Sequence, residues 1–294
     1  MEVLLGLAVA VSMGVSDVIG GLAGRRAGPL RTTTGVHVTG AAIVGLYLLA
    51  TMQHPGGVRE TLLAAAGGLV MAAAAICFYM GLSWGRVTVM SPVTFAAVAV
   101  LTFMSGLLRG ERPSGLALSG VALIFVAVVL VSRPVREPAR PPGEAGARRR
   151  LGLGGEVVLS VCAGGGFVVF QILLLEIGVA DGPAPLLVVR GVGGILGLAA
   201  LAVLRGRGRG ESTGPPRQKA LVPIVVAGAL LILGHSMLIE ALHRGFLSIV
   251  GPITSLTPAF TVLGAWLFLR EHVSRTQLAG MVITIAGLAL LALG

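Results

Sequence analysis

Residues 107–120 read LLRGERPSGLALSG, and residues 267–280, which lie 160 positions further along the chain, read LFLREHVSRTQLAG. The likeness extends without a gap over residues 82–127 and 242–287, where ten of 46 positions carry the same amino acid. Apolar matches arise easily in a chain that is 55% hydrophobic, but a proline, a glutamate and two glycines in register do not. An internal duplication is the best explanation. The matched pairs are Leu82/Leu242, Gly85/Gly245, Pro92/Pro252, Thr94/Thr254, Ala99/Ala259, Leu107/Leu267, Glu111/Glu271, Ser114/Ser274, Leu118/Leu278 and Gly120/Gly280.

The composition identifies a bilayer as the solvent of this chain. Only 12% of the 294 residues are charged, and a water-soluble chain of this length cannot hide so many apolar residues in its core. A helix needs about 20 apolar residues to cross a membrane, and ten stretches approach that length. The sequence therefore predicts an all-α integral membrane protein with ten transmembrane helices. The predicted spans are residues 3–23, 32–52, 61–81, 87–108, 115–132, 153–175, 183–204, 220–241, 247–269 and 276–293.

The ten spans divide into five for each copy of the duplicated sequence. Because five is odd, the second copy enters the bilayer from the opposite side, and a pseudo-two-fold axis in the membrane plane relates the halves. Residues 133–151 separate them and are rich in proline and arginine without an apolar period, which is typical of a solvated linker. We therefore expect one five-helix repeat at residues 1–132 and an inverted one at residues 152–294.

The basic residues indicate an orientation. Although the formal net charge is +10, the basic residues occupy short loops without interleaved aromatic residues, which argues against nucleic acid as a partner. Loops after odd-numbered spans carry 17 of the 22 Lys and Arg residues, whereas loops after even-numbered spans carry four. Because cytoplasmic loops are enriched in Lys and Arg, this distribution predicts that both termini lie outside the cell.

A repeated local pattern carries a resemblance to a known family. Each copy has a proline-containing helix, a glutamate at the exit of that helix, a serine, and a following helix with glycine near its start. This pattern resembles the EamA family of the drug/metabolite transporter superfamily, and the resemblance covers essentially the whole chain. The residues that carry it are Pro92, Gly110-Glu111-Arg112, Ser114 and Gly120 in the first copy, and Pro252, Pro258, Arg270-Glu271-His272, Ser274 and Gly280 in the second.

The resemblance implies a secondary carrier of small organic solutes, such as amino acids, other metabolites or drugs, which are commonly exported across the plasma membrane. It implies ten helices in two inverted repeats, no cofactor, and cytoplasmic termini, the reverse of the orientation that the loop charges predict. A proton is a candidate coupling ion, and the chain is expected as a monomer or a homodimer. Two positions depart from the family pattern: His37 stands where an arginine is usual and where the second copy has Arg190, and Val98 is the counterpart of Pro258.

Ionisable groups at membrane depth are expensive, so each is a candidate for the solute path. Asp17 lies about 9 Å inside its span, at 1.5 Å per residue, and can bind a cationic group, exchange a proton, or pair with Arg25 or Arg26. Ser12 and Ser16 lie on one face of the same helix. Arg190 can hold a carboxylate with two hydrogen bonds or extend its side chain to the lipid headgroups. We name Asp17, His37 and Arg190 as candidates for charge or proton coupling.

Other candidates place polar, aromatic or kinking groups within lipid-like spans. His37 and His235 titrate nearest neutral pH, but two lone histidines on different helices are more often hydrogen-bonded packing groups. Gln171 follows Phe167 by one turn, as in a site for an organic solute, or bonds between helices. Pro92 and Pro252 each free a backbone carbonyl, at Thr88 and Ser248, which can line a cavity or merely bend the helix. The predicted substrate-path residues are Ser16, Asp17, Tyr79, Pro92, Phe167, Gln171, His235, Pro252 and Thr257.

The resemblance further implies a solute cavity near the membrane midplane, between the two repeats, walled by the first, third, fourth, sixth, eighth and ninth spans. Glu111 and Glu271 follow helix ends, where the helix dipole disfavours an acid, so we interpret them as turn-forming residues rather than catalytic ones. A membrane-embedded enzyme and a channel-like pore are the alternatives. Known catalytic motifs, metal-binding clusters and filter loops are absent from the sequence, which predicts neither a catalytic residue nor a metal site.

The loop charges generate a first testable prediction. Cysteines introduced singly at residues 148–150 and 205–209 should resist a membrane-impermeant thiol reagent in intact cells and react after permeabilisation, because the positive-inside rule places both segments in the cytoplasm. A cysteine appended at Gly294 should react in intact cells. Reaction of the 148–150 segment from outside contradicts the predicted orientation and favours the cytoplasmic termini that the family resemblance implies.

Overall fold

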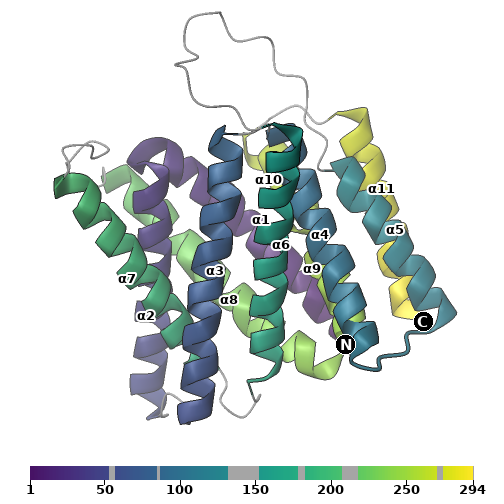
Figure 1. The fold of residues 1–294 in the computed structure, drawn as a ribbon, viewed down its shortest axis with the longest axis horizontal. Coiled ribbons are helices and arrows are strands. Elements are labelled where there is room, and N and C mark those ends of the chain that lie inside the picture. Colours follow the sequence, from purple (N-terminus) through teal and green to yellow (C-terminus); the bar gives the residue numbers. More distant parts are fainter. Residues whose placement is uncertain are drawn as a thin grey trace, which may run out of the picture. The chain divides into compact units, whose positions relative to one another are not determined.

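The computed structural model describes residues 1–52, 57–84, 87–131, 152–177, 183–206, 218–269 and 274–293, so the predicted linker lies outside the described residues. Within these ranges all regular structure is α-helical and there is no strand, so the all-α prediction is confirmed (Figure 1). The helices are α1 (Glu2–Ala27), α2 (Pro29–Thr51), α3 (Val58–Trp84), α4 (Val87–Leu108), α5 (Gly115–Val131), α6 (Leu153–Leu175), α7 (Ala184–Gly206), α8 (Gln218–Arg244), α9 (Leu247–Thr254), α10 (Thr257–Leu269) and α11 (Arg275–Leu293).

Most of these helices are long and apolar enough to cross a membrane. Seven segments of the described chain meet that criterion, with mean hydropathies between 1.4 and 2.3. The remaining predicted spans coincide with shorter apolar helices at Val93–Leu108, Gly115–Leu130 and Arg275–Leu291. The chain is therefore a multi-pass membrane protein, and the count of ten crossings stays a prediction.

The ninth predicted span, residues 247–269, is two helices rather than one. α9 ends at Thr254 and α10 begins at Thr257, so the break occupies Ser255 and Leu256. The segment as a whole remains apolar enough to cross a membrane. The structure thus corrects the expected continuous helix without removing the span.

Pro258 explains this break in physical terms. A proline has no N–H to donate to the carbonyl four residues earlier, which here belongs to Thr254. The hydroxyl of Thr257 donates to that carbonyl instead, at 2.8 Å, and the hydroxyl of Ser255 donates to the carbonyl of Pro252, at 2.6 Å. In the first half, Val98 takes the place of Pro258 and α4 continues unbroken.

The helix bounds extend the register of the duplication. α3 and α8 are both 27 residues long, and their first and last residues lie 160 positions apart. The same shift separates the first residues of α4 and α9, and those of α5 and α11. The sequence similarity that begins at residue 82 therefore continues, as matched helix lengths, back to residue 58.

The chain forms two compact units, and each combines segments from both halves of the sequence. Unit 1 comprises Met1–Ala72 and Val169–Arg244, and unit 2 comprises Ala73–Val168 and Gly245–Gly294. Unit 1 thus contains α1, α2, α7 and α8, whereas unit 2 contains α4, α5, α9, α10 and α11. α3 and α6 contribute to both.

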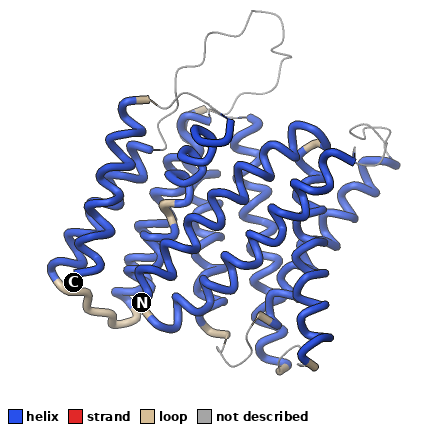
Figure 2. The backbone as a smooth tube through the Cα atoms, turned by 180° about the vertical axis from the view of Figure 1, so that it is seen from behind, coloured by secondary structure: helices blue, strands red, loops and turns tan. Residues whose placement is uncertain are grey.

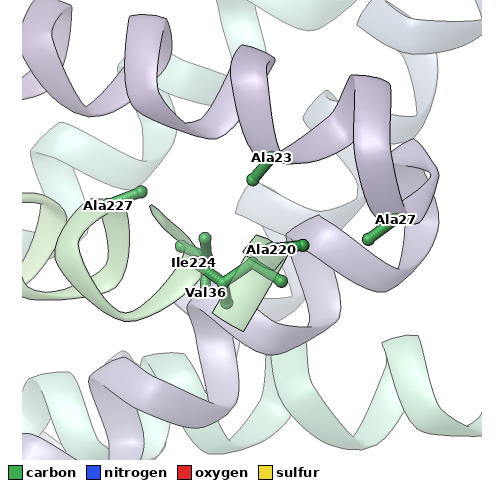
Figure 3. Packing of buried hydrophobic residues seen from close by; sticks show 6 residues of the cluster. All are labelled: Ala23, Ala27, Val36, Ala220, Ile224 and Ala227. Atoms are coloured by element: carbon green, nitrogen blue, oxygen red, sulfur yellow. The ribbon is translucent and has the colours of Figure 1, made fainter. Parts of the chain in front are cut away.

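In unit 1, α1 packs along α8 through small residues and hydroxyl groups. The hydroxyl of Ser12 donates to the carbonyl of Leu230 at 2.7 Å, and that of Ser16 to the carbonyl of Ala227 at 2.8 Å, so the two helices are antiparallel. Figure 3 shows an apolar cluster of the same unit. Its buried members are Ala23, Ala27, Val36, Ala220, Ile224 and Ala227.

In unit 2, α5 and α11 pack side by side, as Figures 1 and 2 both show. A Cβ atom on Gly120 would lie 2.8 Å from the carbonyl oxygen of Gly287, and one on Gly287 would lie 3.1 Å from that of Gly120. The backbones therefore meet at these two glycines, as close packing in lipid requires.

Capping residues begin both of these helices. The N–H of Ala117 donates to the hydroxyl of Ser114 at 3.1 Å, so Ser114 caps α5. Before α11, the N–H of Gln277 donates to Ser274 Oγ at 3.2 Å and the N–H of Ser274 donates to Gln277 Oε1 at 3.0 Å. This reciprocal pair is a capping box, in which the hydroxyl and the amide each satisfy one free N–H of the first turn.

The glycine contact generates a second testable prediction. Gly120→Ala should destabilise the protein by about 1–3 kcal/mol, because the added methyl group meets the backbone of Gly287 and of Leu291 as well as the Leu291 side chain. Gly115→Ala, on the same helix, is the matched control, since nothing lies within 4 Å of its added Cβ. Unfolding by SDS titration in mixed micelles measures both. Equal stability of the two variants contradicts the packing described for α5 and α11.

Candidate functional site

The predicted site residues are distributed over both units. The side chains of Tyr79 and Pro92 lie outside the described residues, although their backbone belongs to α3 and α4. Unit 1 holds Ser16, Asp17, His37, Gln171, Arg190 and His235, and unit 2 holds Tyr79, Pro92, Phe167, Pro252 and Thr257.

Arg190 is the most deeply buried cationic residue that the structure describes in unit 1. Only 1% of it is exposed, so its guanidinium is enclosed by protein and does not extend to a surface. Its Nη2 atom lies 2.9 Å from Nδ1 of His235, which is itself 2% exposed. The Nε atom of Arg190 is buried and has no hydrogen-bond partner among the described residues. The structure thus brings together two predicted residues, from α7 and α8.

Nδ1 of His235 has two competing partners. Besides Arg190, it lies 2.8 Å from the carbonyl oxygen of Leu231. A guanidinium only donates hydrogen bonds and a carbonyl only accepts them. Nδ1 therefore accepts from Arg190 when it carries no proton, and donates to Leu231 when it carries one. The two bonds belong to different protonation forms of the imidazole.

His37 approaches the same region from α2. A Cβ atom on Gly193 would lie 2.5 Å from Nδ1 of His37, and one on Gly40 would lie 3.2 Å from Cδ of Arg190. Each long side chain therefore crosses the other helix at a glycine. The Nδ1 atom of His37 is buried and has no partner among the described residues. Sequence reasoning missed Gly40, whose only signal is its spacing of three from His37.

The aromatic and amide candidates on α6, Phe167 and Gln171, belong to different units. Phe170, which the sequence analysis did not select, packs against His235 with ring centroids 5.4 Å apart. Gln171 is 7% exposed, and its Oε1 atom has no partner among the described residues. Phe167 belongs to unit 2, where its ring meets that of Phe78 in an edge contact, with centroids 6.3 Å apart.

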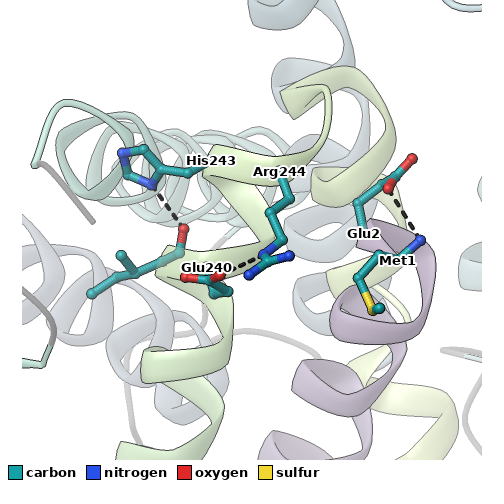
Figure 4. A network of polar contacts seen from close by, with 6 residues as sticks. Met1, Glu2, Glu240, His243 and Arg244 are labelled. Carbon is teal, nitrogen blue, oxygen red and sulfur yellow. Dashed lines mark hydrogen bonds and ion pairs between the residues drawn. The ribbon is translucent and has the colours of Figure 1, made fainter. Parts of the chain in front are cut away.

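Ser16 and Asp17 are adjacent but differ in environment. Ser16 is 5% exposed and its hydroxyl is bonded to α8, whereas Asp17 lies on an exposed face of α1. Towards the C-terminal end of α8, Glu240 pairs with Arg244 one turn later, and His243 bonds to the carbonyl of Ile239 at 2.9 Å (Figure 4). Glu240 is thus a paired residue at a helix end.

In unit 2, Glu111 fixes the start of α9. The N–H groups of Leu247 and Ser248 donate to its two carboxylate oxygens, each at 2.8 Å. A carboxylate at a helix N-terminus is stabilised by the free N–H groups and by the helix dipole. Glu111 therefore caps a helix 136 positions away, a role more specific than the turn-forming one expected from sequence. Its counterpart Glu271 lies outside the described residues.

The helix that Glu111 caps carries Pro252 and leads to Thr257. All eight residues of α9 are buried. Pro252 and Thr257 are both buried next to the break between α9 and α10, and the hydroxyl of Ser248 has no partner among the described residues. In the part of the chain that the structure describes, no group of three His, Cys, Asp or Glu side chains can hold a metal ion.

Comparisons with known proteins agree with this architecture. A model of the EamA-like transporter family matches residues 1–133 and 151–293, which confirms the resemblance drawn from the repeated motif. An uncharacterized protein of Methanocaldococcus jannaschii is 38% identical over 76 residues, which are 26% of this chain and 56% of that protein, so the chain spans little more than half of its relative's length. A solved structure, described only as the crystal structure of a protein, has a TM-score of 0.76 at 14% identity, covering 99% of this chain and 96% of the other, and shows a common fold.

The Glu111 cap generates a third testable prediction. Glu111→Ala should lower stability by about 1–3 kcal/mol, because two N–H groups of α9 lose a charged acceptor. Glu240→Ala removes a partly exposed pair within one helix and should change stability by less than about 1 kcal/mol. SDS titration in mixed micelles measures both, and a Glu111→Ala variant as stable as the control rules out the cap as a stabilising contact.

Proposed function

Because the chain belongs to the EamA-like transporter family, we propose that it is a secondary transporter that carries small organic solutes across a membrane by alternating access between two inverted repeats. The family is one of transporters and not of enzymes. The observation that carries the proposal is the match of the family model to both halves of the chain. Export across the plasma membrane, and a proton as coupling ion, belong to the proposal.

Packing between equivalent helices supports the inverted repeat. A pseudo-two-fold axis in the membrane plane makes equivalent helices antiparallel where they meet. Gly251 of α9 lies against Thr102 of α4, and Ser248 lies against Gly106, so the chain directions of α4 and α9 are opposed. Both contacts lie within unit 2.

Reciprocal contacts in unit 1 support it further. A shift of 153 positions converts His37 into Arg190 and Gly40 into Gly193. The same shift therefore relates the contact of His37 with Gly193 to the contact of Arg190 with Gly40. A two-fold axis between α2 and α7 requires this exchange of partners.

Transport by the purified protein is the fourth testable prediction. Proteoliposomes should accumulate or release members of a panel of amino acids and related metabolites. Asp17→Asn should slow that flux about tenfold or more, because it removes the carboxylate that binds a cationic group of the solute or exchanges a proton. The amide keeps the size of the side chain and removes its charge. Glu240→Gln is the control, since Glu240 pairs with Arg244 at a helix end.

Two outcomes contradict parts of this proposal. Flux absent for every solute of the panel, from protein that is folded and reconstituted, argues against a carrier of such solutes. Flux through Asp17→Asn that equals the parent across pH 5 to 8, an interval chosen to bracket roughly the histidine titration, removes Asp17 from both solute binding and proton coupling.

A further inference from the structure

Arg190 is a buried cation without a counter-charge among the described residues. Arg59 and Arg244, also of unit 1, have side chains that are 64% and 54% exposed, and both form ion pairs with glutamates. No ion pair in the described part of the chain involves Arg190. Its bonded neighbour His235 can accept a hydrogen bond but supplies no negative charge. Burying a charge is costly unless a partner of opposite sign compensates it.

Unpartnered polar atoms lie around the same point. Nε of Arg190 and Nδ1 of His37 are both buried without a hydrogen-bond partner among the described residues. His37 and Gly40 are three residues apart on α2, and Arg190 and Gly193 are three apart on α7, so each pair shares a helix face. Because Arg190 crosses α2 at Gly40 and His37 crosses α7 at Gly193, both side chains lie at one crossing of the two helices.

We propose that Arg190, with His37 and His235, forms a carboxylate-binding site in unit 1, and that the transported solute bears a carboxylate. That the bound carboxylate belongs to a transported solute rests on the proposed function. That a carboxylate binds at Arg190 does not depend on it. A carboxylate takes two parallel N–H bonds from a guanidinium, and Nε with Nη2 forms one such edge. Nε is unpartnered among the described residues, and Nη2 is held by His235.

His235 has the geometry to release Nη2. When the ring proton moves from Nε2 to Nδ1, Nδ1 donates to the carbonyl of Leu231 at 2.8 Å and no longer accepts from Arg190. The imidazole stays neutral through this change, and no proton is gained or lost by the ring. The guanidinium edge is then available to the carboxylate, while His235 keeps one hydrogen bond.

The test uses the purified full chain in detergent, with sodium benzoate as the probe. Benzamide has nearly the same shape without the charge, and sodium chloride supplies an inorganic anion. We expect benzoate to raise the Tm of the protein in a saturable way, and benzamide and chloride at equal concentration to leave it unchanged. A Tm that benzoate does not move, or that benzoate and benzamide raise equally, overturns the proposal. A chloride shift as large as that of benzoate overturns a solute carboxylate in favour of an inorganic anion.

Variants assign the effect to Arg190. Arg190→Gln should weaken benzoate binding about tenfold or more, because it removes two charge-assisted hydrogen bonds to the ligand. Arg244→Gln is the matched control and should bind like the parent. If Arg190→Gln does not fold, Arg190→Lys is the second variant. It keeps the charge but lacks two parallel N–H donors, and it should therefore bind benzoate more weakly than the parent. Parental affinity in a folded Arg190 variant overturns the assignment, and it does so without any transport measurement.

Discussion

Helices in lipid gain no hydrophobic energy from packing on one another, so the arrangement of this chain depends on close backbone contact at small residues. Gly120 and Gly287 provide that contact between α5 and α11, and Gly228 provides it between α8 and α2, where an added Cβ would lie 3.1 Å from the carbonyl oxygen of Val36. The sequence has 45 glycines, and glycine within a helix lowers helix stability. Close helix packing offsets that loss.

The same solvent dictates where polar groups go. The hydroxyls of Ser12 and Ser16 donate to carbonyls of α8, and that of Thr257 donates to a carbonyl to which Pro258 cannot donate. These bonds satisfy polar groups within the protein, as a bilayer requires. Arg190 differs, because its buried Nε remains unpartnered among the described residues. The hydroxyl of Ser248 is also buried and unpartnered among the described residues, so Arg190 is distinguished by its charge together with its missing hydrogen bond.

Sequence reasoning succeeded where the information is local or repeated. The helical segments and the family resemblance follow from periodicity and from the duplicated motif. It did not find that Glu111 caps α9, because that contact joins residues 136 positions apart. Nor did it find the pairing of Arg190 with His235, since residues on different helices are brought together only by the packing of α7 and α8.

The departures from repetition carry information of their own. If the halves exchange conformations as we propose, identical repeats would give the inward-facing and outward-facing states equal free energy by symmetry. Pro258, where the first half has Val98, breaks one helix of an equivalent pair. Arg190, where the first half has His37, places a permanently charged side chain in the second half of the sequence only. These two differences remove the equality. The preference of the carrier for one state, and its response to a charged solute, then depend on residues that the duplication does not share.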